Sequence, residues 1–103
     1  MIEAYIYYKD KQVYGFKIKN HANSHVCAAV SMFSINTINS IESLTDDDFT
    51  CDYNEKGGFI DFKLKYKPSI KASVLLDALK LGLVSAKKEH PKEIKIIESE
   101  VII

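Results

Sequence analysis

The chain has 103 residues, 47% of them hydrophobic, which is enough for one continuous core and too many for a disordered tail. Acidic and basic side chains balance at 14 each, so no overall positive charge favours direct binding of nucleic acid. The sequence shows neither an apolar signal segment nor a run of bilayer-spanning length, so we expect a cytoplasmic protein whose two cysteines are thiols rather than a disulfide.

The first two predicted elements are strands that form a hairpin. Residues 2–9 alternate between apolar and polar side chains, which is the period of a strand with one face on the core. Residues 13–19 follow after a turn at residues 10–12. The side chains predicted to share one face of this second strand are Tyr14, Phe16 and Ile18.

A helix of roughly five turns is predicted next, because the spacing of apolar residues changes to three and four after position 24. Its predicted core stripe consists of Val26, Ala29, Val30, Phe33, Thr37, Ile38, Ile41 and Leu44. Three aspartates at positions 46–48 end this pattern. We interpret them as a solvated loop, because they lack the alternate spacing of a calcium-binding loop.

A second hairpin and a second helix follow. Residues 49–53 and 60–66 alternate on either side of a glycine-containing turn, and Cys51 is expected to be buried or half-buried on its strand. Ser69 can cap a helix that stops at His90-Pro91. The core stripe expected for this helix is Leu75, Ala78, Leu79, Gly82, Leu83 and Ala86.

Residues 93–103 are predicted to form a last strand with an apolar end. The elements therefore follow the order ββαββαβ. This order predicts an α+β layer sandwich, in which two helices pack on a mostly antiparallel sheet. No repeat or low-complexity segment interrupts the chain, so we expect residues 1–103 to form a single domain.

The segment between the second strand and the first helix carries the residues that could support catalysis. If Ser24 is the N-cap, Cys27 is the third helical residue, where a thiolate faces unpaired backbone N–H groups. A helix N-terminus stabilises an anion by about 0.3–1 kcal/mol, and the same N–H groups could hold the oxyanion of a tetrahedral intermediate. The imidazole of His21 can pair with the thiolate and later protonate the leaving amine. We prefer His21 to His25, which would point away from Cys27 around a regular helix.

Other interpretations of these residues remain open from the sequence. A cysteine at the start of an apolar helix face often serves only as a small buried hydrophobe. A zinc site built from His21, His25 and Cys27 would need a fourth ligand, and the chain has no Cys-x-x-Cys pair. The candidates for that ligand are Cys51, His90 or a carboxylate. Ser31 and Ser34 could support the site or bond back to helical carbonyl groups.

The motif around these residues resembles that of a known family. The Gly-His-Ala and Val-Cys-Ala-x-Val-Ser signature of the ribosomal-processing cysteine proteases, the Prp family, is closely matched by Asn20-His21-Ala22 and Val26-Cys27-Ala28-Ala29-Val30-Ser31. The resemblance also covers the order of elements along nearly the whole chain. It implies that Cys27 is the nucleophile and His21 the general base.

Three further residues are candidates for supporting roles. Ser31 lies one turn beyond the cysteine, Asn20 takes the place of the glycine before the histidine, and Ser24 stands where many family members have an acidic residue. Asn tolerates the left-handed backbone angles of such a glycine better than most residues. No third group that orients His21 can be assigned from the sequence.

The resemblance implies an endopeptidase that removes the N-terminal extension of a large-subunit ribosomal protein during bacterial ribosome maturation. Thiol chemistry of this kind calls for no metal or organic cofactor. An extended substrate peptide could lie against an exposed strand edge or beside the first helix, and the candidate contacts are Tyr5, Tyr7 and Phe59. The alternative function is a non-catalytic ribosome-associated or peptide-binding module in which Cys27 only packs.

A homodimer is also implied by the resemblance. The second helix carries more apolar residues than one face can hold, and the residues in excess are Leu76, Leu81 and Val84. Burial of these residues inside a thick monomer core would produce the same pattern. The sequence leaves these two explanations open.

Overall fold

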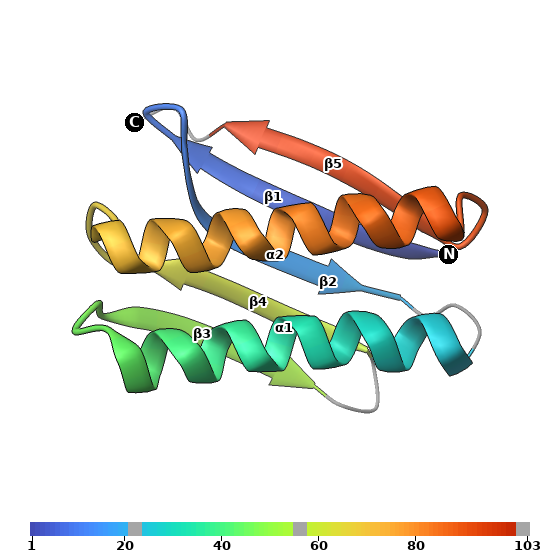
Figure 1. The fold of residues 1–103 in the computed structure, drawn as a ribbon, viewed down its shortest axis with the longest axis horizontal. Helices are drawn as coiled ribbons and strands as arrows, with labels where there is room; N and C mark the ends of the chain where they lie inside the picture. Colours follow the sequence, from blue (N-terminus) through green and yellow to red (C-terminus); the bar gives the residue numbers. More distant parts are fainter. Residues whose placement is uncertain (21–23, 55–57, 101–103) are drawn as a thin grey trace.

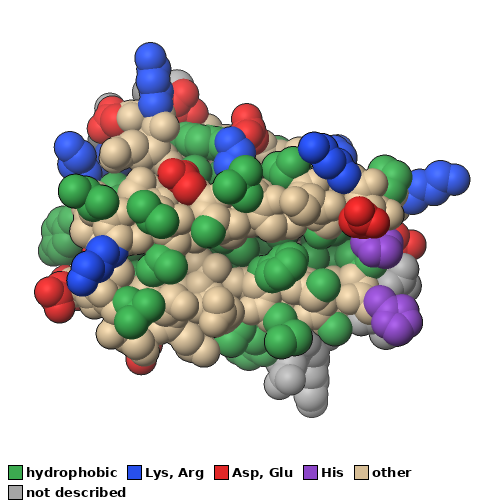
Figure 2. Space-filling view, in the orientation of Figure 1, with side chains coloured by type: hydrophobic (Ala, Val, Ile, Leu, Met, Phe, Trp, Pro, Cys, Tyr) green, Lys and Arg blue, Asp and Glu red, His purple; other side chains and the backbone are tan. Residues whose placement is uncertain are grey.

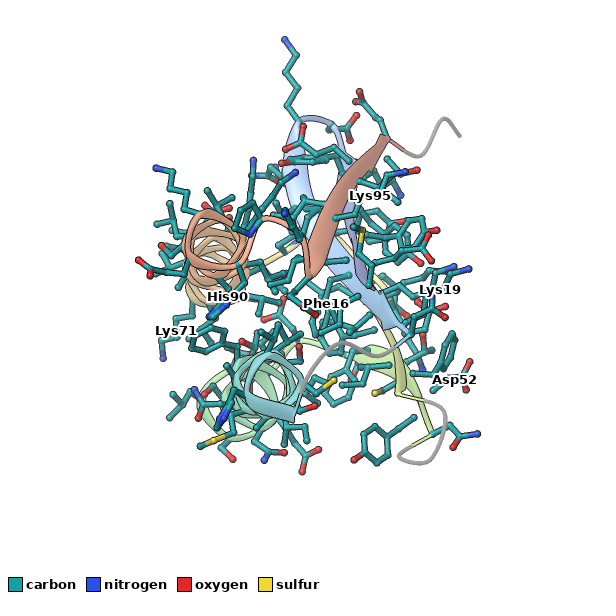
Figure 3. All side chains as sticks on the ribbon, turned by 90° about the vertical axis from the view of Figure 1, so that its right-hand side faces the viewer. Phe16, Lys19, Asp52, Lys71, His90 and Lys95 are labelled. Atoms are coloured by element: carbon teal, nitrogen blue, oxygen red, sulfur yellow. The ribbon has the colours of Figure 1, made fainter. Side chains whose placement is uncertain are left out.

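The computed structural model describes residues 1–20, 24–54 and 58–100, which contain five strands and two helices (Figure 1). The elements in chain order are β1 (Ile2–Lys9), β2 (Gln12–Lys19), α1 (Ser24–Leu44), β3 (Phe49–Asn54), β4 (Phe59–Leu64), α2 (Ile70–Glu89) and β5 (Ile94–Glu100). Both helices cover the same face of the sheet (Figure 3). The predicted ββαββαβ sandwich is therefore confirmed, and the predicted apolar end at 101–103 lies outside the described residues.

The strands lie in the order β3-β4-β2-β1-β5. All neighbouring pairs are antiparallel except β1 and β5, which run parallel, so the sheet is mostly antiparallel as predicted. Glu3 pairs with Lys19, so the end of β2 lies beside the start of β1. These two strand ends are found at the same end of the molecule as the beginning of α1 (Figure 1).

The hydrophobic core fills the space between the sheet and the helices. The rings of Phe16 on β2 and Phe62 on β4 stack with their centroids 5.4 Å apart, and the Phe49 ring lies 5.0 Å from that of Phe62. The apolar side chains that the helices bury are Val26, Val30, Ile41, Ala72, Leu76, Leu79 and Leu83. Since each buried methylene contributes about 0.8 kcal/mol, this layer is the main source of stability.

A β-bulge between β1 and β2 changes one predicted position. Val13 pairs with Tyr8 and Gly15 pairs with Tyr7, so Tyr14 is an extra residue on β2. Val13 is buried, whereas the ring of Tyr14 lies 6.0 Å from that of Tyr7 on the opposite face of the sheet. The prediction that Tyr14 shares a face with Phe16 and Ile18 is therefore wrong, because strict alternation does not continue through a bulge.

Helix α2 begins and ends where the sequence predicts. The Ser69 hydroxyl caps it by accepting a 3.1 Å hydrogen bond from Ala72 N, and at the other end His90 N donates to Ala86 O over 2.9 Å. The Asp47 carboxylate accepts hydrogen bonds from the Ser69 backbone N–H (2.9 Å) and hydroxyl (2.5 Å). Partial burial raises the pKa of Asp47, but these hydrogen bonds outweigh it and lower the pKa overall.

The helices bury narrower stripes than predicted, because a helix that lies flat on a sheet contacts it with only part of its circumference. On α2, Ala78 is exposed, whereas Leu76 is fully buried in the core. On α1, Phe33 and Leu44 are 42% and 60% exposed. Ser34 is buried instead, and its hydroxyl donates a 2.8 Å hydrogen bond to the carbonyl group one turn earlier.

Across the described residues, neither helix is long and apolar enough to cross a membrane.

Candidate active site

Cys27 lies at the beginning of α1. The helix starts at Ser24, so Cys27 is its fourth residue, one position later than an N-cap at Ser24 would give. It still belongs to the first turn of α1, which is the positive end of the helix dipole. The Cys27 side chain is half-buried and packs against the edge of the core. Its sulfur therefore has both an apolar support and access to solvent.

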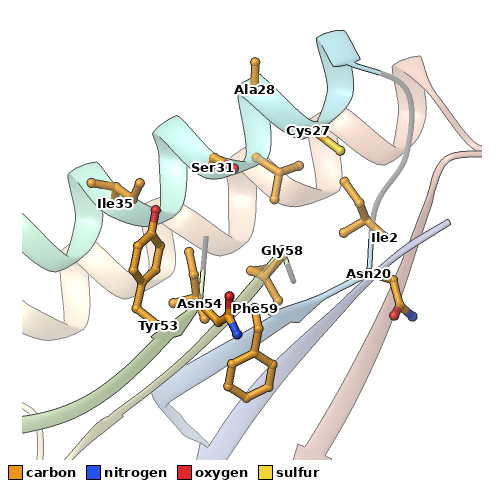
Figure 4. A pocket seen from close by; sticks show the side chains of 13 residues that line it. Ile2, Asn20, Cys27, Ala28, Ser31, Ile35, Tyr53, Asn54, Gly58 and Phe59 are labelled. Carbon is orange, nitrogen blue, oxygen red and sulfur yellow. The ribbon is translucent and has the colours of Figure 1, made fainter. Parts of the chain in front are cut away.

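A cavity of about 310 Å³ opens beside Cys27 (Figure 4). Its apolar side is formed by three buried residues at strand ends, which are Ile2, Ile18 and Ile60. Helix α1 contributes Cys27, Ala28, Ser31 and Ile35. The volume is at the lower end of the range of about 300–1,000 Å³ that is usual for ligand sites.

The β3–β4 hairpin supplies the wall opposite α1. Tyr53 and Asn54 of β3 and Phe59 of β4 line the cavity, and the Tyr53 ring points toward Ile35 across it (Figure 4). Tyr53 is nevertheless 53% exposed. Sequence reasoning did not identify Tyr53 as a site residue. A large aromatic ring placed just before a hairpin turn, where little could bury it, is the signal that could have found it.

The structure brings some of the predicted site residues together at this cavity. Cys27, Ser31 and Asn20 all line the cavity, and Ser31 is exposed one turn beyond Cys27. His21 lies outside the described residues, and of Ser24 only the position at the start of α1 is described. Ser34, which bonds back to a helical carbonyl group, takes no part in the cavity.

Two of the three candidate substrate contacts on the sheet lie away from this cavity. The Tyr5 ring is on the open face of the sheet, where the Lys17 Nζ lies 4.7 Å from its centroid. The Tyr7 hydroxyl donates to the Asp61 carboxylate over 3.3 Å. Burial and the neighbouring Asp61 charge raise the pKa of Tyr7 far above its usual range. Of the three candidates, only Phe59 borders the cavity.

Cys51, His25 and His90 are the remaining described residues that the sequence offered as metal ligands. Among the described residues, no three His, Cys, Asp or Glu side chains lie close enough to hold a metal ion, and neither Cys27 nor Cys51 is in a disulfide. Cys51 is exposed, so the prediction that it is buried or half-buried is wrong. The reason is that β3 is the edge strand of the sheet. Partial burial and the nearby charges of Asp52 and Asp61 raise the pKa of the Cys51 thiol.

Comparison with known proteins identifies the family. The family model of the cysteine protease Prp matches residues 1–95. The chain belongs to the Prp family. It is therefore a cysteine protease, as the motif around Cys27 predicted. Among curated proteins, none matches the sequence.

Three solved structures share the fold, and two of them are of Prp. The ribosomal processing protease Prp from S. aureus, in complex with a covalently linked product peptide, is 23% identical, with a TM-score of 0.90 over 96% of this chain and 100% of that chain. The same S. aureus protease with a substrate peptide is 21% identical, with a TM-score of 0.89 and the same coverage. SMU.848 from Streptococcus mutans is 26% identical, with a TM-score of 0.88 over 98% of this chain and 96% of that chain.

Proposed function

We propose that this Prp-family protease removes the N-terminal extension of a large-subunit ribosomal protein during bacterial ribosome maturation. The observation that carries the proposal is the position of Cys27, half-buried at the start of α1 on the wall of the cavity. The S. aureus Prp structures, which hold a product peptide and a substrate peptide, support a peptide as the substrate. We place the reaction in the cytoplasm and assign residues 1–103 to one catalytic domain.

The proposed reaction is acyl transfer through a thioester. Cys27 passes its thiol proton to His21 and its sulfur attacks the scissile carbonyl carbon, while the positive end of α1 stabilises the oxyanion that forms. The C–N bond then breaks as His21 protonates the leaving amine. Water, deprotonated by His21, attacks the thioester, which releases the carboxylate product and restores the Cys27 thiol. The proposed reaction uses no redox partner or cofactor.

The substrate peptide is proposed to lie between α1 and the β3–β4 hairpin. In this groove the strand-end isoleucines offer an apolar surface to one substrate side chain, and Tyr53 can cover it from the hairpin side. Asn54, at the end of β3, also borders the cavity and has polar atoms that an extended peptide backbone could use. Residues next to the scissile bond would thus be held beside Cys27.

Substitution of Cys27 tests the proposal directly. Purified wild-type protein and Cys27→Ala are incubated with the full-length ribosomal protein precursor, and the products are weighed by mass spectrometry. We expect the wild type to remove the extension and Cys27→Ala to lose at least about 10³-fold in kcat while still binding the precursor. His21→Ala should show a loss of similar size, because the two residues act as one unit.

The matched control is Cys51→Ser, which changes the other thiol of the chain. Cys51 is exposed on the edge strand β3 and is not among the residues that line the cavity. This variant should cleave at the wild-type rate. Cleavage by Cys27→Ala, or equal losses in Cys27→Ala and Cys51→Ser, would refute the assignment of the nucleophile. Loss of cleavage together with loss of precursor binding in Cys27→Ala would instead indicate a structural cysteine.

We further propose that the protein is a homodimer formed through the outer face of its helices. Of the ten exposed large hydrophobic residues in the described chain, seven lie on α1 and α2. These seven are Met32, Phe33, Ile35, Leu44, Ile70, Val74 and Leu81, of which Ile35 lines the cavity and is left out of the proposed dimer surface. Figure 2 shows apolar side chains spread over the two helices. An apolar surface of this kind is typical of an interaction site.

Of the three α2 residues on which the sequence-based dimer prediction rested, only one is well exposed. Leu76 is fully buried in its own core and is not available to a partner, and Val84 is half-buried, whereas Leu81 is 69% exposed. Leu81→Glu should therefore convert a dimer into a monomer in light scattering at micromolar concentration. The control is Tyr66→Glu, which places the same charge at a 72% exposed residue outside the helices. A monomeric wild type would refute the proposal.

A further inference from the structure

Asn20 is the residue that connects β2 to His21, and its backbone conformation is unusual. Its φ is 70°, in the left-handed region, which strains a residue with a side chain and is tolerated best by Asn and Asp among such residues. Asn20 directly follows the end of β2 and lines the same cavity as Cys27. Asn20 is thus the last described residue before His21.

The side chain of Asn20 is fastened to β1. Its Nδ2 donates a hydrogen bond to Oε2 of Glu3, and the hydroxyl of Tyr5 donates to Oε1 of the same carboxylate over 3.1 Å. Figure 4 shows the Asn20 amide turned away from Cys27. The amide therefore acts as a tether on the far side of the strand and does not face the reacting sulfur.

The Glu3 carboxylate accepts hydrogen bonds from Asn20 and Tyr5, although two lysines are its neighbours on the adjacent strands. Lys19 on β2 and Lys95 on β5 are its partners in the strand register. Among the described residues, neither lysine forms an ion pair with Glu3. Both carboxylate oxygens are instead occupied by Tyr5 and Asn20. A glutamate that served only to balance charge on the sheet would be expected to contact one of these lysines.

We propose that Glu3 is a positioning residue for the protease reaction, acting through Asn20 to fix the point from which the chain leads to His21. This inference rests on the proposed role of His21 as the general base. Proton transfer requires heavy atoms within about 2.6–3.2 Å of each other, and a misplacement of about 1 Å can cost about 10²-fold in rate. An anchor one residue before the histidine limits such misplacement.

The family signature has a glycine where this chain has Asn20. A glycine at this position adopts a positive φ without strain. The chain described here has an asparagine instead, which bears the strain and gains a side chain that can be tied to Glu3. The tether gives a physical reason for an asparagine at this position.

The experiment measures kcat and KM for cleavage of the precursor by Glu3→Ala and Asn20→Gly. We expect each variant to lower kcat by about 10-fold to 100-fold and to leave KM within about twofold. Asn20→Gly is the sharper of the two, because glycine relieves the backbone strain while it removes the tether. Its melting temperature should stay the same or rise even as kcat falls, which a merely structural role for Asn20 would not produce.

Two further variants serve as rescue and control. Glu3→Gln keeps an oxygen that can accept the hydrogen bond from Asn20, so it should recover most of the kcat lost in Glu3→Ala. Glu98→Ala is the matched control, because the Glu98 carboxylate accepts a 3.0 Å hydrogen bond from Tyr8 near the other end of β1. It should keep the wild-type kcat.

The double variants separate this inference from the proposed function. Glu3→Ala combined with Asn20→Gly should lose no more kcat than the single variants, and Glu3→Ala added to His21→Ala should cause no further loss. Wild-type kcat in Glu3→Ala or Asn20→Gly would overturn the inference and leave the role of His21 intact. Wild-type cleavage by His21→Ala would overturn the role of His21, and with it the inference.

Discussion

Two glycine-to-alanine substitutions are expected to change stability in opposite directions. At Gly15 on β2, an added Cβ would lie 2.3 Å from the carbonyl oxygen of Phe62 and 3.0 Å from the Cα of Lys63. Real Cβ atoms do not approach closer than 3.0 Å, so β2 and β4 would have to separate by at least 0.7 Å (3.0 − 2.3). Both neighbours are backbone atoms, so no side chain can rotate away. The strain falls on the ladder from Gly15↔Lys63 to Ile18↔Ile60, which attaches the β3–β4 hairpin to the rest of the sheet.

The expected cost for Gly15→Ala is that of overpacking, about 1–3 kcal/mol. A loss of 1 kcal/mol lowers Tm by about 4–8 °C in a domain of this size, so Tm should fall by about 4–24 °C. At Gly82 on α2, the nearest atom to an added Cβ is Cδ2 of Phe33 at 3.6 Å, which is ordinary contact. Gly82→Ala should gain about 0.8–1.0 kcal/mol of helix propensity, which raises Tm by about 3–8 °C.

Thermal unfolding followed by circular dichroism measures both shifts, and urea unfolding checks that the m-value is unchanged. The cleavage assay adds a second measure, because the hairpin that Gly15→Ala displaces carries Tyr53 on the wall of the cavity. An unchanged Tm in Gly15→Ala would show that the close approach of the two strands is not a constraint. A fall in Tm for Gly82→Ala would refute the reasoning on α2.

Three further predictions follow from named contacts. The pKa of Asp47 is lowered in the folded state, so its stabilising effect is present above the unfolded pKa of about 3.9 and is lost as pH falls through the lower folded value. Asp47→Asn should therefore lower Tm at pH 6 and make progressively less difference as the pH is lowered below the unfolded pKa. At pH 6 the loss should be about 1 kcal/mol, because the hydrogen bonds to Ser69 are exposed to solvent. Leu76→Ala should cost about 2–5 kcal/mol in urea unfolding, since that side chain is fully buried; a cost below 1 kcal/mol would contradict its place in the core. Tyr53→Ala should raise KM about 2-fold to 12-fold for the loss of one aromatic contact, whereas Tyr66→Ala, an exposed tyrosine away from the cavity, should not; equal effects would remove Tyr53 from the site.

The parts of the fold that sequence patterns predict are those in which each element has one buried face. The two-residue alternation of β1 and β4 and the three- and four-residue spacing in the helices follow directly from burial against one layer. The cap at Ser69 and the stop at His90 were also predictable, because capping is local chemistry. Local signals of this kind do not depend on which elements become neighbours.

The predictions of burial fail where they depend on which elements become neighbours in the fold. Tyr14 changes face because of a bulge, which depends on how β2 pairs with β1. Cys51 is exposed because β3 is an edge strand, which an alternating pattern does not reveal. Ala78, predicted in the core stripe, is exposed because of how α2 rotates against the sheet.

The candidate site divides in the same way. Cys27 could be found from its place at a strand-to-helix junction, since the helix start is a local feature. Tyr53 was missed, because its place on the cavity wall depends on the pairing of the second hairpin with β2 through β4. The tether between Glu3 and Asn20 likewise joins residues 17 positions apart, through the register of β1 and β2.

The parallel pairing of β1 with β5 has a consequence for the time course of synthesis. Ile2 pairs with Ile94, so the first strand waits for a partner that is translated 92 residues later (94 − 2). At a translation rate of about 5–20 residues per second, this delay lasts roughly 5–20 s. During that interval one edge of β1 is open to pairing with other chains, and chaperones that bind the nascent chain would protect it.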